Sequence, residues 1–183
     1  MSEELMIRHC APTLAGMKTG SLFSYAPEQG ENIRDEIRSL NRRLSAKGLR
    51  VLPLCMQKQR VLIYVYRPGK LREDFAAEEI RALLAECGYC GGKPEQCVAA
   101  LMRRLRSQGD FPHEIGLFLG YPPEDVIGFI RHKDCGCKCV GCWRVYGDVR
   151  KAETLFARYK RCTDQFLTAW KNGSTVEQLA VSA

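Results

Sequence analysis

The run VLIYVY at residues 61–66 constrains the fold most, because it is apolar at almost every position. A strand with one wet face alternates apolar and polar residues, whereas a strand covered on both faces does not. A second β-prone run occupies residues 51–56, and the polar residues 57–60 separate the two. The sequence therefore predicts a hairpin over about residues 50–66 whose second strand is central and covered on both faces.

Other short apolar segments predict further strands. Residues 19–25 (TGSLFSY) are aromatic enough for a strand that follows a loop at residues 9–13. Residues 113–120 (HEIGLFLG) are typical of a buried strand, over about 114–119, and residues 143–146 (WRVY) of a last short one. Together with the hairpin they predict a small, mainly antiparallel sheet.

Apolar residues recur at helical spacing in the intervening segments, which predicts amphipathic helices. The predicted helices cover residues 32–44, 71–87, 94–105 and 123–130, and a long C-terminal helix covers residues 148–170. Strands mixed with segregated helices, without regular alternation of strand and helix, are typical of an α+β fold packed by helices.

The length of 183 residues favours a single α+β domain over residues 1–183, with a polar, frayed tail at 172–183 that has one candidate turn around residues 176–179. Charged residues make up 27% of the chain, and no apolar run approaches the roughly 18 residues of a membrane span. Glu3 and Glu4 stand where a signal peptide carries positive charge. We therefore expect a cytoplasmic protein without membrane association.

The chemistry expected of the ten cysteines depends on this compartment. Cytoplasmic thiols stay reduced, so cysteine clusters there are more often metal-binding or catalytic than disulfide-bonded. The densest segment spans residues 135–142 and contains Cys135, Cys137, Cys139 and Cys142. Such thiols suit zinc, copper(I) or iron–sulfur chemistry, and the small neighbours Gly136 and Gly141 let the backbone wrap an ion.

A second cysteine pair, Cys87 and Cys90, could join Cys139 and Cys142 in a four-cysteine site. The 48 residues between Cys90 and Cys139 far exceed the compact spacing of a zinc ribbon, so this pairing depends on the fold. The competing interpretation is a loop of reduced thiols that binds no metal.

Redox exchange is a further alternative, because either CxxC pair can form a disulfide. Cys87 stands at the C-terminal end of its predicted helix, where the helix dipole raises a thiol pKa, and this argues against a thioredoxin mechanism. Cys97 has the better electrostatic position but is expected to pack in the core, as are Cys55 and Cys162. Structural roles are also favoured for three histidine positions: His9 beside Cys10, His113 beside Glu114, and His132.

The net charge of +7 keeps a different class of function open, that of a basic module that binds nucleic acid or an acidic protein. No helix-turn-helix or RNA-recognition signature supports it, and no serine elbow, P-loop or GxGxxG indicates an enzyme class. Whether the chain is an enzyme therefore stays open. The candidate basic face, with Tyr146 and Tyr159 nearby, comprises Arg103, Arg104, Arg106, Arg144, Arg150, Lys151, Arg158, Lys160 and Arg161.

Three phrases resemble one bacterial protein family: residues 9–16 (HCAPTLAG), 113–122 (HEIGLFLGYP) and 143–148 (WRVYGD) resemble domain-of-unknown-function family DUF3793. The resemblance covers nearly the whole chain and implies a full-length domain. It also implies a link to iron or redox physiology, in the company of flavodoxins. We therefore expect a thiol-rich protein that binds a metal or exchanges redox equivalents; the alternative is a basic module for nucleic acid or an acidic partner such as a flavodoxin.

Overall fold

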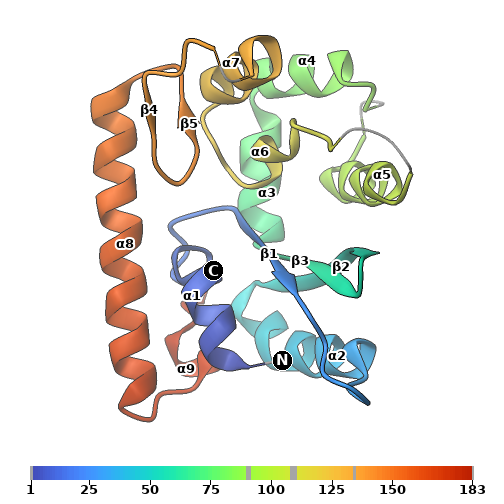
Figure 1. The fold of residues 1–183 in the computed structure, drawn as a ribbon, viewed down its shortest axis with the longest axis vertical. Helices are drawn as coiled ribbons and strands as arrows, with labels where there is room; N and C mark the ends of the chain where they lie inside the picture. The colour runs from blue at the N-terminus through green and yellow to red at the C-terminus, as the bar shows by residue number, and fades with distance from the viewer. Residues whose placement is uncertain (1, 90–91, 108–110, 134, 183) are drawn as a thin grey trace.

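A three-stranded antiparallel sheet lies in the middle of the molecule (Figure 1). The computed structural model describes residues 2–89, 92–107, 111–133 and 135–182. The strands are β1 (Gly20–Tyr25), β2 (Arg50–Gln57) and β3 (Arg60–Tyr66), in the order β1-β3-β2. The predicted hairpin and its central second strand are thus confirmed, as is the strand predicted at residues 19–25.

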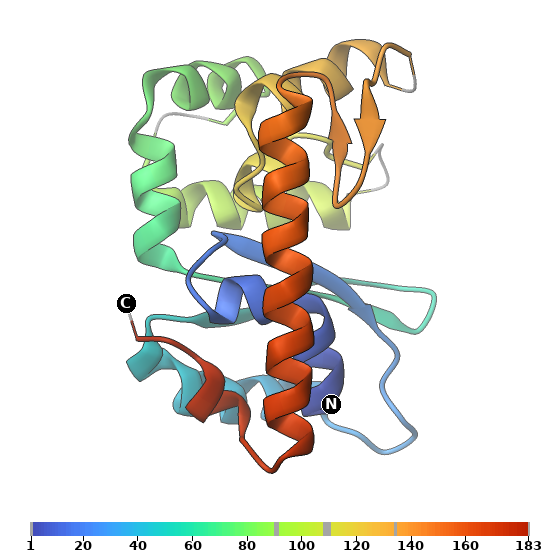
Figure 2. The same ribbon diagram turned by 90° about the vertical axis from the view of Figure 1, so that its left-hand side faces the viewer.

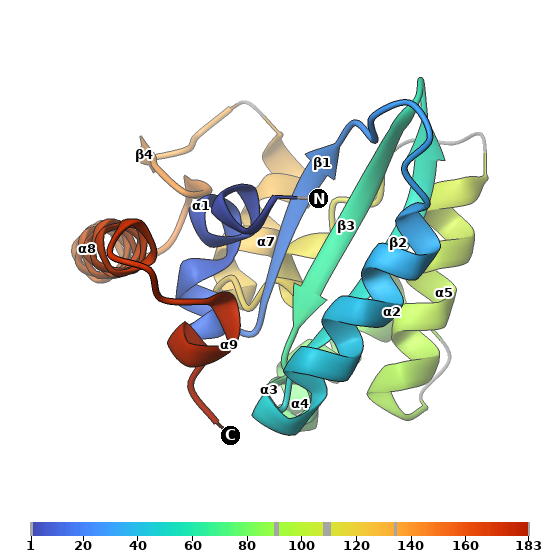
Figure 3. The ribbon, with the colours of Figure 1, turned by 90° about the horizontal axis from the view of Figure 1, so that it is seen from below.

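The side chains of β3 alternate between two hydrophobic clusters, which explains its continuous apolar sequence. Val61, Ile63 and Val65 pack with α1 (Glu3–Leu14) and α2 (Ile33–Leu44) on one face. Tyr64 and Tyr66 pack on the other face, which α5 (Pro94–Arg106) helps to cover. Figure 3 shows α2 and α5 on opposite sides of the sheet. The fold is α+β, as the sequence predicts.

The helices between β3 and the cysteine-rich segment cover the second face and form one end of the molecule (Figure 1). The helix predicted over residues 71–87 is in fact two, α3 (Pro68–Ala76) and α4 (Glu78–Glu86), because Ala77 between them is extended. Farther along come α6 (Ile115–Phe118) and α7 (Pro123–His132).

The strand predicted at residues 114–119 is wrong, because this segment forms α6. Leu117 and Leu119 donate backbone hydrogen bonds to the carbonyls of Glu114 and Ile115, at 3.0 and 3.2 Å. All four residues of α6 are buried. A short apolar run has the same appearance in a buried strand and in a buried helical turn, so the pattern alone could not separate them.

The helix α8 (Val149–Lys171) runs along the length of the molecule (Figure 2) and packs against α1. Its N-cap is Asp148, whose carboxylate accepts a hydrogen bond from the backbone of Lys151 at 3.1 Å. Two short strands, β4 (Cys139–Val140) and β5 (Arg144–Val145), precede α8, so the strand predicted at residues 143–146 is present but shorter.

The described part of the C-terminal tail, residues 172–182, packs against the body, so the prediction of a frayed end is wrong there, whereas the candidate turn at 176–179 is present. The turn α9 (Val176–Leu179) begins with a capping box between Thr175 and Gln178. Val176 is fully buried, and the amide of Val181 donates to the carbonyl of Leu14 at 3.0 Å. Residues 9–13, predicted to be a loop, belong to α1. The 3-10 turn η1 (Ser45–Lys47) joins α2 to β2.

Candidate functional site

Residues 135–147, which we call the cysteine hairpin, carry the densest cluster of thiols beside α8 (Figure 1). Cys139 pairs with Val145, and Val140 pairs with Arg144, in the two-stranded β4–β5 sheet. The amide of Gly141 closes the turn by donating to the carbonyl of Trp143 at 3.0 Å. A methyl group at position 141 would overlap the ring of Phe156 on α8, so only glycine allows this close approach.

Asp125, in the first turn of α7, fastens the cysteine hairpin to the helical end of the molecule. Its carboxylate is 3% exposed and accepts a hydrogen bond from Trp143 Nε1 at 2.7 Å. It also accepts hydrogen bonds from the backbone amides of Tyr146 at 2.7 Å and Gly147 at 2.8 Å. Sequence reasoning missed this role, because the acidic start of α7 carries no signal of its distant partners.

An aromatic pocket of about 380 Å3 lies between α6, α7 and the cysteine hairpin. Tyr121 stacks on Trp143 with ring centroids 4.7 Å apart, and His113 meets Phe129 edge-on at 4.9 Å. Cys142 forms part of the wall, so one thiol of the hairpin faces a space that can hold an apolar ligand. His113 has the structural contact expected from the sequence and also lines this pocket.

Cys142 and Lys18 are near enough for the charge of each side chain to shift the pKa of the other. Although Cys142 is exposed as a residue, desolvation raises the pKa of its thiol, and the charge of Lys18 acts in the opposite direction. Burial lowers the pKa of Lys18 to about 8, against the pull of Cys10 and Cys142. The ammonium of Lys18 lies 4.9 Å from the centroid of the Tyr121 ring. Lys18 therefore couples the segment between α1 and β1 to Cys142.

Among the candidate cysteines in the described ranges, Cys137 and Cys139 lie near enough for the charge of one thiol to act on the other. Both are partly buried and two residues apart at the start of β4. Burial raises the pKa of the Cys139 thiol, and the charges of Glu153, Asp125 and Cys137 raise it further. The two thiols are therefore within electrostatic range of each other, and the raised pKa of Cys139 means that its thiol keeps its proton until something displaces it.

The remaining candidates are not gathered with this pair. Cys135 is exposed just past α7, and Cys87 is the partly buried C-cap of α4, where burial and Glu114 raise the pKa of its thiol. The helix α7 packs between α4 and the hairpin (Figure 1). In the part of the chain that the structure describes, no three Cys, His, Asp or Glu side chains converge as ligands. Cys90 lies outside the described residues.

The other cysteines are buried. Cys55, Cys97 and Cys162 belong to the hydrophobic clusters, which confirms the core packing predicted for them. Complete burial raises the pKa of Cys10 to about 12, and the neighbouring His9 stacks on Phe23 with centroids 5.3 Å apart. All nine cysteines that the structure describes are free thiols.

A family model described as protein of unknown function, DUF3793, matches residues 6–180. The chain belongs to this family. No curated protein and no solved structure matches the chain. None of the helices in the described ranges is both long enough and apolar enough to cross a membrane.

Two of the phrases that carry the DUF3793 resemblance meet in space around the aromatic pocket. Residues 113–122 contribute His113 and Tyr121 to its wall, and residues 143–148 contribute Trp143. The third phrase, residues 9–16, lies mostly in α1, on the side of Lys18. The phrases therefore build the surroundings of Cys142 rather than the thiols at residues 135–139.

Proposed function

We propose that the protein binds a soft metal ion through the thiols of the cysteine hairpin. Cys137 and Cys139 are the first ligands, and Cys135 and Cys142 complete the site. The observation that carries the proposal is the association of Cys137 with Cys139, both partly buried, on a hairpin that Asp125 holds in place. A pair of thiols held together needs less rearrangement to capture an ion than four scattered ones.

The ligand type favours copper(I), with zinc next. Thiolates select soft or borderline ions, whereas magnesium and calcium require oxygen ligands. Structural zinc needs four ligands in a tetrahedron. In the described part of the chain, two thiols rather than four are near each other. Gly136 has a left-handed φ of 76° and open space around it, so Cys135 can move toward the pair.

Redox exchange has weaker support than metal binding. An attacking cysteine needs a low pKa, but the pKa values of Cys139 and Cys142 are both raised by burial. Metal capture does not require a free thiolate in advance, because the ion displaces the thiol protons as it binds. Affinity should accordingly rise with pH, because fewer protons then compete with the metal. A role in iron or redox physiology would follow from occupancy of this site.

The test is an anaerobic titration of the reduced protein with copper(I), and separately with zinc, against a chromophoric chelator. We expect one ion to be retained per chain and the double variant Cys137→Ser/Cys139→Ser to lose it. Cys87→Ser is the matched control, because Cys87 is also partly buried but lies on α4, and it should retain the ion.

The proposal fails if neither ion competes with the chelator, or if the double variant binds as well as the unchanged protein. Loss of binding in Cys87→Ser as well would instead support the four-cysteine arrangement with Cys139 and Cys142. Mass spectrometry of intact protein after mild oxidation separates the redox alternative, because a disulfide lowers the mass by two hydrogens.

A further inference from the structure

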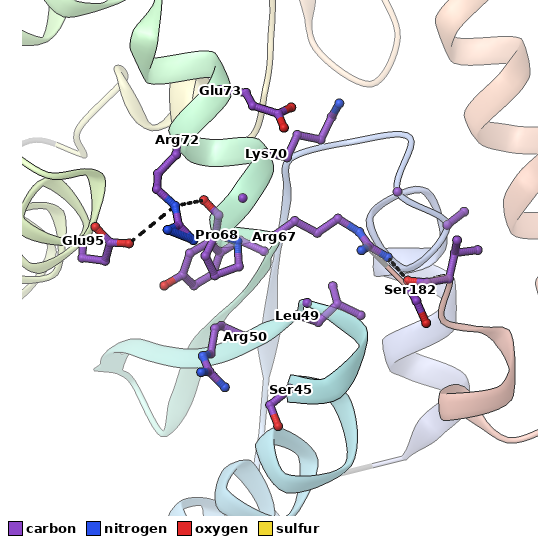
Figure 4. A pocket seen from close by; sticks show the side chains of 16 residues that line it. Ser45, Leu49, Arg50, Arg67, Pro68, Lys70, Arg72, Glu73, Glu95 and Ser182 are labelled. Carbon is purple, nitrogen blue, oxygen red and sulfur yellow. Dashed lines mark hydrogen bonds and ion pairs between the residues drawn. The ribbon is translucent and has the colours of Figure 1, made fainter.

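A second pocket, of about 820 Å3, lies where β3 passes into α3, and the cysteine hairpin contributes nothing to it. Five separate segments surround it: the end of α1, the stretch from η1 into β2, the start of α3, Glu95 on α5 and the C-terminal tail. Figure 4 shows Ser45 and Leu49 on one side of Arg67 and Pro68, and Ser182 beyond the end of the Arg67 side chain. The packed tail is thus part of the wall.

The charge of the lining is predominantly positive. Four cationic side chains line the pocket, against two carboxylates, those of Glu73 and Glu95. Arg72 and Glu95 approach only to 3.9 Å, and both are more than half exposed, so this pair neutralises little charge. In Figure 4, Arg72 and Lys70 lie on one side of Pro68 and Arg50 on the other.

Arg67 places a buried positive charge in the wall. The residue is 4% exposed and donates hydrogen bonds to the carbonyls of Thr13 at 2.7 Å and Leu14 at 2.6 Å. It also donates to the carbonyls of Lys47 at 3.1 Å and Val181 at 2.7 Å. Carbonyls satisfy its donors but carry no net charge, and no carboxylate in the described ranges forms an ion pair with it. Burial lowers its pKa without removing its charge at neutral pH.

The backbone at the start of α3 adds to the positive electrostatic potential of the pocket. The N-cap is Arg67, whose side chain does not cap the helix, and a Cβ at Gly69 would have nothing within 4 Å. Helix starts carry partial positive charge, which reinforces the cations beside them. A pocket that combines a buried guanidinium, three further cations and the start of a helix is suited to an anion.

We propose that this pocket binds a small phosphorylated molecule. The phosphorylated group lies over the start of α3, with Lys70 and Arg72 on one side of it and Arg50 on the other, and Arg67 supplies the buried charge. A pocket of this size falls in the range that holds a nucleotide or a sugar phosphate. Its walls come from five segments around a partly open hollow, whereas a nucleic-acid backbone needs a long, continuous basic surface. Glu73 and Glu95 are acceptors for hydroxyl or amino groups of the same ligand.

The experiment uses the full-length protein and the probes inorganic phosphate and pyrophosphate, with binding followed by amide chemical shifts at near-physiological salt. We expect saturable shifts in residues 67–73, with pyrophosphate binding more tightly. Lys70→Gln and Arg50→Gln should each weaken binding about tenfold, because each removes one charge-assisted contact. The controls Lys160→Gln and Arg34→Gln, at exposed sites on α8 and α2, should leave it unchanged.

Thermal unfolding of each variant shows whether it has folded. We expect the variants to fold, because Lys70 and Arg50 lie outside the hydrophobic clusters. Equal weakening by Lys160→Gln would show only general attraction to a basic protein and would overturn the proposal. Saturable binding of an oligonucleotide without binding of pyrophosphate would overturn it in favour of a nucleic-acid surface. Neither outcome bears on the metal titration, so this proposal and the proposed function are tested independently.

Discussion

Removal of the Asp125 carboxylate tests how the cysteine hairpin is held. Asp125→Ala leaves three donors without their acceptor: the indole of Trp143 and the amides of Tyr146 and Gly147. An unsatisfied buried donor costs about 1–3 kcal/mol. The Trp143 bond is buried and should carry the full cost, whereas the two amides are only partly buried and can recruit water. We therefore expect a loss of roughly 3–5 kcal/mol in the free energy of unfolding.

The assay is urea denaturation followed by circular dichroism. Asp125→Asn should cost less, roughly 1–2 kcal/mol, because the amide oxygen still accepts from the backbone while its NH2 group faces the donor of Trp143. Asp164→Ala, at an exposed site on α8, is the matched control and should be within about 0.5 kcal/mol of the unchanged protein. A loss below about 1 kcal/mol for Asp125→Ala would refute the reasoning, since the three donors would then be satisfied without the carboxylate.

Three further predictions concern burial and titration. Val176→Ala should lower the free energy of unfolding by roughly 1–3 kcal/mol in urea, whereas a frayed tail would predict no change. Lys18 has a folded-state pKa of about 8, below its ordinary value of 10.5, so the unfolded chain holds this proton more tightly and Lys18 contributes stability that rises with pH through this window. Lys18→Met should remove that contribution, seen as a smaller slope of stability between pH 8 and 9; an unchanged slope contradicts it. Maleimide labelling followed by peptide mass spectrometry should modify exposed Cys135 first and Cys10, whose pKa is raised to about 12, last; early labelling of Cys10 would show that the core opens readily.

Elements whose signal is local and long could be predicted from the sequence. The central position of β3 follows from a run that is apolar on both faces, and α8 follows from a periodicity sustained over 23 residues. The predictions for the segment at 114–119 and for the tail were wrong for one reason. Each is short, and its conformation depends on what packs around it: α6 is buried on every side, and Val176 is buried against α1.

Only part of the candidate site could likewise be predicted from the sequence. The cysteines at 135–142 and the short strand that follows could be found from composition and spacing. The partners that organise them could not, because Asp125 reaches residues 18 to 22 positions away and Lys18 reaches Cys142 from the other end of the chain. Such contacts are set by tertiary packing, and a single aspartate or lysine in a sequence does not predict them.

The helix α8 makes distant parts of the molecule mechanically continuous. Its first half holds the cysteine hairpin through Phe156 and Tyr159, and its second half joins the cluster that buries the tail through Cys162. At 1.5 Å per residue the rod is ~34 Å long, and packed helices shift as rigid bodies rather than bend. A displacement of the cysteine hairpin would therefore be carried along α8 toward α9, because Val176 packs in the same cluster as Cys162.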